Sequence, residues 1–376
     1  MPNTQTLSYS TLYLPNHPPF TTETLRQAER PEAIISYAAL PASLQSAVRF
    51  AWQWEHGNEL FTVATSGSTG PPKTIEVHRQ QILVSVGLTQ QALHLASHHT
   101  ALLCLNANTI GGTMMIARAL HLGMDMEWVA PTANPWSVAT RSPDFVALVP
   151  LQMQTVLTET PERLANLHAI LVGGAPVGLA LEEAIRTQVT SPVYSTYGMT
   201  ETLSHVALRR LNGLEAGPNY RVLGDTHIDT DERGCLTIRG EITQQRRIVT
   251  NDLVDIADAR HFRWRGRYDW IINSGGVKVS PERVELAVEQ GLANAGSVPR
   301  FFVTGFPDER LGQRVVLIVE AEVASEEAQQ QLLRTIAEAL PPYHAPKEIR
   351  YAQAFRETKS GKVDRHATVQ AILLGG

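Results

Sequence analysis

The chain has 376 residues, and its 32 basic and 37 acidic side chains give a formal net charge of −5. This length favours two or three domains of about 150 residues each. The acidic balance argues against a protein that coats nucleic acid, because such proteins gather Lys and Arg. The two cysteines, Cys104 and Cys235, are too few for a disulfide framework or a four-cysteine zinc site.

Charged residues are spread along the whole chain, so no stretch reads as a membrane span. The opening stretch MPNTQTLSYSTLYLPNHPPF lacks the basic-then-apolar order of a signal peptide. We therefore expect a cytoplasmic protein.

The predicted elements alternate along most of the chain after a helix over residues 41–54. Short strands are predicted at the apolar runs 61–65, 101–105, 144–150, 169–173 and 192–197. Helix-period segments separate them at 79–93, 112–123, 151–160 and 179–189. This alternation is typical of a largely parallel sheet with helices on its faces. The shorter runs of residues 217–265 predict an antiparallel or barrel-like part.

A new unit is predicted after Arg267. It begins with a strand, a loop and a helix, and it continues with two strands and a helix over residues 325–340. Pro341 and Pro342 would end that helix. We therefore expect two domains, residues 1–266 and residues 267–376.

Residues 65–73 read TSGSTGPPK directly after an apolar strand. The glycines let backbone N–H groups approach an anion, the hydroxyls add donors, and the lysine adds a positive charge. Pro72 stands where a Walker A loop needs Gly, and the alternative is a solvated turn. The residues expected to contact phosphate are Thr65, Ser66, Gly67, Ser68, Thr69, Gly70 and Lys73.

The motif YGMTET follows the apolar run at 192–197. A carboxylate at the carboxyl end of a sheet strand lies where α/β sheets bind ligands. Glu201 could hold a Mg²⁺ ion that bridges nucleotide phosphates, with the Thr200 hydroxyl on a phosphate oxygen. The alternative is a helix that Thr200 caps, with Glu201 in its first turn.

Two further features suit a nucleoside. The small residues 173–176 (GGAP) would let a flat base lie against the backbone, although any strand-to-helix turn can look like this. Asp252 could accept both ribose hydroxyls, and Arg267 could donate to them. The alternative is a β-hairpin with a surface Arg–Asp pair.

The stretch TKSGKVDR at residues 358–365 is basic. A mobile loop of this kind would deliver an ammonium group to a phosphate, whereas most basic tails are solvated faces.

Five motifs, in this order, resemble the signatures of the adenylate-forming superfamily of acyl-CoA synthetases, nonribosomal adenylation domains and luciferases. They are TSGSTGPPK, YGMTET, TNDL, GRYDWIINSGGVKVSPERVE and KSGKVDR. The stretch YGMTETLSHVALRRLNG is similar to the o-succinylbenzoate–CoA ligase branch. The resemblance implies an α/β fold, with a large N-terminal domain of helix-flanked β-sheets and a small mobile α+β C-terminal domain. The phosphate loop comes early, so the fold would be shortened at its N-terminus.

The resemblance implies two half-reactions. A carboxylate attacks the α-phosphate of MgATP to give an acyl-adenylate, and the CoA thiol then takes the acyl group as AMP leaves. The 65–73 loop would hold the β- and γ-phosphates, Thr200 a phosphate oxygen and Glu201 the Mg²⁺ ion. The expected contacts of the adenine and the ribose are Gly174, Ala175, Tyr197, Asp252 and Arg267.

The resemblance also gives roles to the C-terminal unit. Lys362 would bridge the attacking carboxylate and the α-phosphate. Asp269 would be the hinge about which the C-terminal domain rotates between the steps. The loop of Gly275, Gly276 and Lys278 would then replace the lysine loop at the site for thioester formation.

Arg118 lies in the apolar run 112–123. An Arg in an apolar wall suits a carboxylate anchor for a dicarboxylate such as o-succinylbenzoate, and the alternative is a side chain that snorkels to solvent. Ser204 and His205 would line the same pocket or lie on a helix surface.

The expected partners are a small-molecule acid, ATP and CoA, without nucleic acid, and a homodimer stays open. Menaquinone biosynthesis would be the pathway of the o-succinylbenzoate ligase. Two other functions remain open at this point. One is a ligase of CoA or a carrier protein with another aryl or short acyl acid, and the other is a nucleotide-binding pseudoenzyme.

Overall fold

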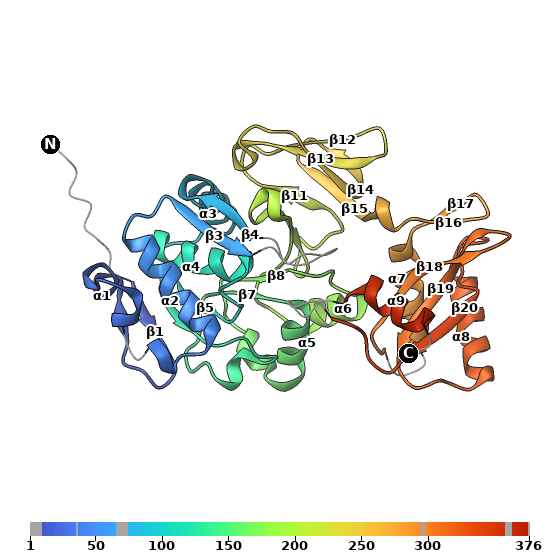
Figure 1. The fold of residues 1–376 in the computed structure, drawn as a ribbon, viewed down its shortest axis with the longest axis horizontal. Helices are drawn as coiled ribbons and strands as arrows, with labels where there is room; N and C mark the ends of the chain where they lie inside the picture. Colours follow the sequence, from blue (N-terminus) through green and yellow to red (C-terminus); the bar gives the residue numbers. More distant parts are fainter. Residues whose placement is uncertain (1–9, 35–36, 65–73, 295–297, 358–362, 375–376) are drawn as a thin grey trace.

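The computed structural model describes residues 10–34, 37–64, 74–294, 298–357 and 363–374. Over these ranges the chain forms a 13-stranded sheet, a 5-stranded sheet and a separate two-stranded hairpin. Figure 1 shows the large sheet with its helices on the left and the smaller sheet on the right. The expected α/β class, with a large N-terminal and a smaller C-terminal part, is confirmed.

The middle of the large sheet is parallel. Its strands, in spatial order, are β6 (Asp125–Trp128), β5 (Thr100–Leu103), β7 (Phe145–Leu148), β8 (Ala169–Val172) and β9 (Val193–Gly198). Successive side chains point to opposite faces: Ala101 and Leu103 enter one buried cluster, and Leu102 and Cys104 enter another. Both faces are therefore covered, as parallel sheets require.

The helices divide between the two faces (Figure 1). On one face the apolar cluster includes side chains of α1 (Thr22–Gln27), α2 (Ala42–Glu55), α3 (Arg79–Leu93) and α4 (Ile110–Leu122). On the other face it includes side chains of α5 (Pro150–Glu159) and α6 (Leu179–Gln188). The helices expected over residues 41–54, 79–93, 112–123, 151–160 and 179–189 are confirmed within two residues.

Antiparallel strands extend the parallel middle of the sheet on both sides. Next to β9 follow β10 (His205–Arg210), β11 (Tyr220–Val222), β15 (His261–Arg267), β14 (Ile248–Asp258), β13 (Cys235–Arg239) and β12 (His227–Thr230). This confirms the antiparallel part expected over residues 217–265. At the other flank, β1 (Thr11–Tyr13) runs parallel to β6, and β2 (Phe20–Thr21) runs antiparallel to β1. The sequence pattern did not predict these two short strands.

The strand expected at residues 61–65 is present, but it lies outside the large sheet. β3 (Leu60–Ala64) pairs with β4 (Thr74–His78) in an antiparallel hairpin outside the large sheet. Phe61, Val63 and Val77 are buried on one face of the hairpin, while Thr62 and Glu76 are exposed on the other. A strand that is apolar on one face only suits an antiparallel pair rather than a sheet covered on both faces.

The smaller sheet contains β16 (Ile272–Ser274), β17 (Val277–Val279), β18 (Phe301–Asp308), β19 (Gly312–Glu320) and β20 (Glu348–Ala352). Helices α7 (Pro281–Asn294) and α8 (Glu326–Glu338) pack on one face, and α9 (Arg365–Leu373) packs on the other. The chain passes from one sheet to the other between Arg267 and Ile272. A boundary at residue 267 and mobility of the smaller part stay predictions. In the described ranges no helix is long and apolar enough to span a membrane.

Candidate active site

The residues expected at the base lie where the neighbouring strands β8 and β9 end. A Cβ on Gly173 would lie 2.1 Å from Thr196 Oγ1, and Gly174 has a φ of +86°, so both positions suit glycine. Gly174 and Ala175 are exposed at this edge. The carboxyl edge of such a sheet is where α/β proteins bind ligands.

Tyr197 and Asp252 meet at the same edge. Tyr197 Oη donates to Asp252 Oδ2 over 2.7 Å, and Trp264 Nε1 donates to Oδ1 over 3.1 Å. Burial and the Asp252 carboxylate raise the pKa of Tyr197, so its phenol stays a donor. Each oxygen of Asp252 keeps a lone pair for a further donor, such as a ribose hydroxyl. The sequence did not predict Trp264, because no motif marks it.

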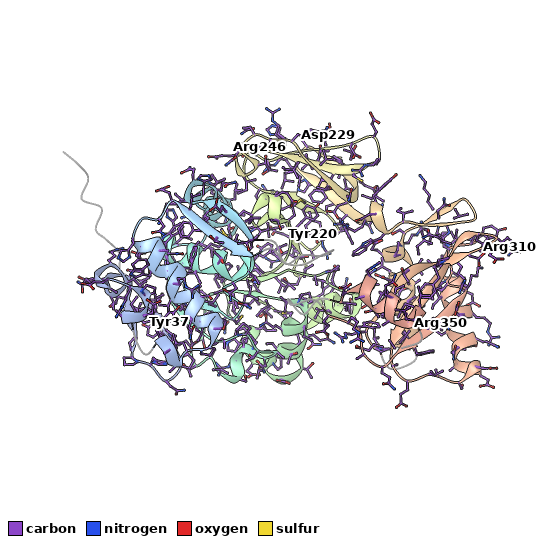
Figure 2. The ribbon with its side chains drawn as sticks, viewed as in Figure 1. Tyr37, Tyr220, Asp229, Arg246, Arg310 and Arg350 are labelled. Carbon is purple, nitrogen blue, oxygen red and sulfur yellow. The ribbon has the colours of Figure 1, made fainter. Side chains whose placement is uncertain are left out.

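An aromatic cluster holds the ring of Tyr197. Phe262 meets it edge-on with ring centres 5.0 Å apart, and Tyr220 stacks on Phe262 at 5.5 Å. The hydroxyl groups of Tyr220 and Ser195 lie 3.0 Å apart. Tyr220 is near the middle of the molecule in Figure 2. Tyr197 is therefore fixed beside the strand ends rather than free to turn.

Arg267 lies opposite Asp252 in the β14–β15 register, but its guanidinium turns to Asp269. Nε and Nη2 donate to the two Asp269 oxygens over 2.9 and 2.7 Å. These bonds raise the pKa of Arg267. The structure thus brings Tyr197, Asp252 and Arg267 together and joins Arg267 to the expected hinge residue. Their roles toward a nucleotide stay a prediction.

A tight turn joins β9 to β10. It holds one 3-10 turn, Thr200–Thr202, and the strand β10 then begins at His205. Thr202 closes the turn, because its hydroxyl accepts from Met199 N over 3.0 Å and lies 2.8 Å from Ser204 O. The alternative of a helix that Thr200 caps is wrong, because Met199 stands at the cap position and the helical turn is only three residues long.

Glu201 is exposed on this turn and forms no hydrogen bond or ion pair with the described part of the chain. Within that part, no three His, Cys, Asp or Glu side chains gather into a metal cage. A Mg²⁺ ion at Glu201 would take its remaining ligands from phosphates and water, which is the usual pattern for this ion. The residues present fit a metal that arrives with a nucleotide.

Arg118, Ser204 and His205 form one hydrogen-bonded group with Thr89. Arg118 Nε donates to Thr89 Oγ1 over 3.2 Å, and Nη2 donates to Ser204 Oγ over 2.9 Å. His205 Nε2 lies 3.0 Å from Thr89 Oγ1, and its Nδ1 lies 3.5 Å from Ser204 Oγ. We call these four side chains the polar cluster. It joins α3, α4 and the start of β10.

Three side chains of the polar cluster are buried, with Arg118 2%, Thr89 0% and His205 6% exposed, and Ser204 is half-buried on the turn before β10. A snorkelling Arg118 is therefore wrong, and so is a helix-surface position for Ser204 and His205. Burial lowers the pKa of Arg118 to about 9. Burial and the charge of Arg118 lower the pKa of His205 well below its ordinary value. None of the described carboxylates pairs with Arg118.

Thr89 was not predicted from the sequence, although its position in the helical pattern of residues 79–93 could have indicated it. Thr89 and Ser85 lie four residues apart among the apolar side chains on the buried face of α3. A polar pair on the apolar stripe of a helix usually has a partner inside the protein.

The sequence profile of the AMP-binding enzyme family matches residues 21–234, more than half of the chain. The chain belongs to the AMP-binding enzyme family. The profile of the AMP-binding enzyme C-terminal domain matches residues 287–362 of the same chain.

Two relatives and one distant fold neighbour show how far the likeness extends. This AMP-binding enzyme is 26% identical over 330 residues to the 2-succinylbenzoate–CoA ligase of Staphylococcus aureus (strain MSSA476), over 80% of its own length and 65% of the relative. It thus spans less than two thirds of that relative. A solved acyl-CoA synthetase (AMP-forming)/AMP-acid ligase II-like protein from Dyadobacter fermentans is 38% identical, with 93% of this chain and 98% of that one covered and a TM-score of 0.61. The O-succinylbenzoate coenzyme A synthetase of Bacillus subtilis, solved with ATP and magnesium ion, shares the fold at 20% identity and a TM-score of 0.68, with 82% and 69% covered.

The loop expected to act in thioester formation is the tip of the β16–β17 hairpin of this AMP-binding enzyme. Gly275 and Gly276 have φ values of +61° and +86°, as a two-residue hairpin turn needs. Lys278 follows them, exposed on β17. The tip points away from the large sheet in Figure 1. The structure therefore does not bring this loop to Tyr197 and Asp252.

The remaining expected site residues lie outside the described ranges. They are Thr65, Ser66, Gly67, Ser68, Thr69, Gly70, Lys73 and Lys362.

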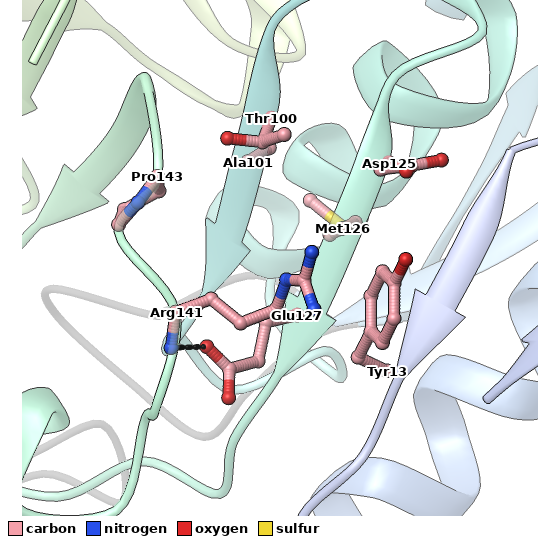
Figure 3. Close-up of a pocket in the computed structure, with 8 residues that line it drawn as sticks. All are labelled: Tyr13, Thr100, Ala101, Asp125, Met126, Glu127, Arg141 and Pro143. Atoms are coloured by element: carbon pink, nitrogen blue, oxygen red, sulfur yellow. Dashed lines mark hydrogen bonds between the residues drawn. The ribbon is translucent and has the colours of Figure 1, made fainter. Parts of the chain in front are cut away.

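Figure 3 shows a cavity at the β1–β6–β5 edge of the AMP-binding enzyme, beside Tyr13, Glu127 and Arg141. Its volume is about 10 Å³, which holds at most one water molecule. The Glu127 carboxylate there accepts from the backbone of Thr140 and Arg141 over 2.9 and 3.0 Å. This cavity is therefore a packing feature and not a substrate site.

Proposed function

We propose that this protein is an ATP-dependent, AMP-forming acid–CoA ligase, and that its acid is a dicarboxylate of the 2-succinylbenzoate type. The observation that carries the proposal is the buried guanidinium of Arg118, which has no anion among the described residues. Ser204, which binds it, follows Glu201 by three residues on one turn. An acid site beside a metal and phosphate site is what adenylation of an acid needs. The family match and the Staphylococcus aureus relative support this class of reaction.

In the first half-reaction, a carboxylate oxygen of the acid attacks the α-phosphorus of ATP. The bond to the β-phosphate breaks, and pyrophosphate leaves. Asp252 and Arg267 would hold the ribose, while Tyr197, Gly174 and Ala175 border the adenine. The Thr200 hydroxyl would donate to a phosphate oxygen. A Mg²⁺ ion held by Glu201 would neutralise phosphate charge.

Negative charge builds on the phosphate oxygens in this step, so donors and cations lower its barrier. Residues 65–73 would supply N–H groups, hydroxyls and Lys73 to the β- and γ-phosphates. The ammonium of Lys362 would bridge the attacking carboxylate and the α-phosphate.

In the second half-reaction, the CoA thiol attacks the acyl carbon, and the bond to AMP breaks. We place this step in a second arrangement, in which residues 267–376 rotate about Asp269 relative to residues 1–266. The hairpin of Gly275, Gly276 and Lys278 would then face the site. Its position away from the large sheet in Figure 1 supports the need for such a movement.

A dicarboxylate would supply the anion that the Arg118 guanidinium lacks among the described residues. One carboxylate reacts with ATP, and the other pairs with the guanidinium. An unpaired buried cation costs free energy, and a bound carboxylate restores it through charge-assisted hydrogen bonds. In this role the protein would serve menaquinone biosynthesis.

The test is acid-dependent exchange of pyrophosphate into ATP over a panel of acids. The panel holds 2-succinylbenzoate, benzoylpropionate (the same molecule without the ring carboxylate), ortho-butanoylbenzoate (a methyl group replaces the chain carboxylate) and benzoate. We expect the highest kcat/KM with 2-succinylbenzoate and a CoA thioester as the final product. Faster exchange with a monocarboxylate would contradict the dicarboxylate, and ATP turnover without acid would contradict the ligase.

A further inference from the structure

The hydroxyl of Thr89 is the centre of the polar cluster. It accepts from Arg118 Nε over 3.2 Å, because a guanidinium only donates. It also lies 3.0 Å from His205 Nε2 and 3.1 Å from the backbone oxygen of Ser85. Its own proton goes to one of these two groups, and in both cases a lone pair remains for Arg118. Thr89 of α3 is thus joined to α4 through Arg118 and to β10 through His205.

The polar cluster uses one particular edge of the guanidinium. Nε binds Thr89 and Nη2 binds Ser204, and these two N–H groups point to the same side of the planar group. The end of the guanidinium, with both N–H groups of Nη1 and the second of Nη2, has no acceptor in the described ranges. That end is a fork that matches the two oxygens of a carboxylate.

Thr89 approaches from α3 and Ser204 from the turn before β10, so two separate elements fix the plane of the guanidinium. Arg is a long side chain with several rotatable bonds, and binding improves when its orientation is fixed before the ligand arrives. Thr89 is 0% exposed, which keeps water from replacing the hydroxyl.

We infer that Thr89 is a positioning residue that aims the Arg118 fork at the carboxylate that does not react, and thereby sets selectivity for dicarboxylates. The inference rests on the proposed function. It adds a residue that touches no substrate and acts through Arg118.

The test compares Thr89→Val, which keeps the shape and removes the hydroxyl, with Thr89→Ser, which keeps the hydroxyl. We expect Thr89→Val to raise the KM for 2-succinylbenzoate about tenfold to a hundredfold. Its kcat, and its KM for whichever monocarboxylate of the panel is accepted, should change by less than about threefold. Thr89→Ser should stay close to the native enzyme. Equal effects on both acids, or no effect on either, would overturn the inference.

Thr158→Val is the control for the backbone bond, because the exposed Thr158 makes the same bond to the carbonyl four residues back in α5 without meeting an Arg. If Thr89→Val does not fold, as its melting curve would show, Ser204→Ala removes the other hold on Arg118 and carries the same expectation. A Ser204→Ala variant with unchanged selectivity would then overturn the inference.

The double variant Thr89→Val/Arg118→Leu separates this inference from the proposed function. If Thr89 acts through Arg118, its substitution adds nothing once Arg118 is gone. A further loss of selectivity in the double variant would overturn the role of Thr89 and leave the anchor intact. If Arg118→Leu alone leaves selectivity unchanged, the anchor itself is wrong.

Discussion

The carboxylate of Glu289 on α7 accepts a 2.9 Å hydrogen bond from the backbone N–H of Leu179, the first residue of α6. Its second oxygen accepts an equal bond from Ala180 N. Free N–H groups and the dipole at a helix start stabilise a negative charge. A Cβ on Gly178 would lie 2.8 Å from Glu289 Oε1, so Gly178 leaves the room that Glu289 needs. This contact holds the smaller sheet against the large one in the present arrangement.

We expect Glu289→Ala to release the smaller sheet from α6. Each of the two charge-assisted hydrogen bonds contributes about 1.5–3 kcal/mol. Without them, other arrangements of the smaller sheet relative to the large one become populated. Small-angle scattering should report a larger radius of gyration, and adenylation should slow relative to thioester formation. Glu326→Ala on the exposed start of α8 is the control. Scattering and rate ratio both unchanged would show that Glu289 does not hold the arrangement.

Lys362→Ala should slow adenylation by about 10²–10³, since a charge contact to the transition state is lost. Thioester formation from supplied acyl-adenylate should survive. The two half-reactions are measured separately, by pyrophosphate exchange and by thioester formation. Lys359→Ala in the same basic stretch is the control and should change neither. An equal loss of both half-reactions would contradict this division of roles.

Arg118→Leu should raise the KM for 2-succinylbenzoate about tenfold to a hundredfold and leave the KM for benzoate nearly unchanged. The free protein should melt no lower than the native one, because a buried cation without a partner is removed.

Arg209→Leu is the matched comparison for Arg118. Arg209 is paired with both oxygens of Glu182 over 2.7 Å, so its loss leaves a carboxylate unpaired and should lower the melting temperature. If Arg118→Leu destabilises the free protein as strongly as Arg209→Leu, then Arg118 has a partner in the folded state.

Trp264→Phe should raise the KM for ATP several-fold, because Asp252 Oδ1 loses its hydrogen-bond donor and the carboxylate can turn more freely. A hydrogen bond to a charged group contributes about 1.5–3 kcal/mol. The KM for the acid should not change. Trp136→Phe makes a similar loss of volume elsewhere, and its Nε1 has no hydrogen-bond partner among the described atoms. An ATP KM that changes equally in both variants would point to packing instead of Asp252.

Acid should destabilise the fold through His205. The unfolded chain takes up a proton near the ordinary pKa of 6.5, and the folded protein does not, because burial and Arg118 lower the pKa of His205. The unfolded state therefore binds more protons below pH 6.5, and the free energy of unfolding falls as the pH drops through that value. His205→Gln should flatten this slope in urea titrations between about pH 6.5 and 5. His227→Gln on the exposed strand β12 is the control, and an equal flattening there would contradict the assignment.

Local patterns predicted the strands β5, β7, β8 and β9 and the helices α2 to α6, because helical and strand periods depend on residues close together in the sequence. The strands β1, β2, β6 and β10 were not predicted. The run 101–105 is apolar on both faces, and the strand β5 is indeed covered on both. The run 61–65 shows why partners escape such patterns. The length of β3 suits a strand of the large sheet, but β3 pairs with β4 in a separate hairpin. Which strand pairs with which depends on the folded chain and not on the apolar run itself.

The sequence by itself determined the family motifs, the order of the helices α2 to α6 and of the strands β5, β7, β8 and β9, and the unusual position of Arg118 in an apolar run. Only the tertiary structure decided that Arg118 is buried and that Thr89, 116 residues from His205, and Ser204, 86 residues from Arg118, close around it. It also decided that Trp264 holds Asp252 and that Glu289 joins the two sheets. Helical and strand periods arise from contacts a few residues apart, whereas these hydrogen bonds join side chains that only the packing of separate elements brings within hydrogen-bond distance.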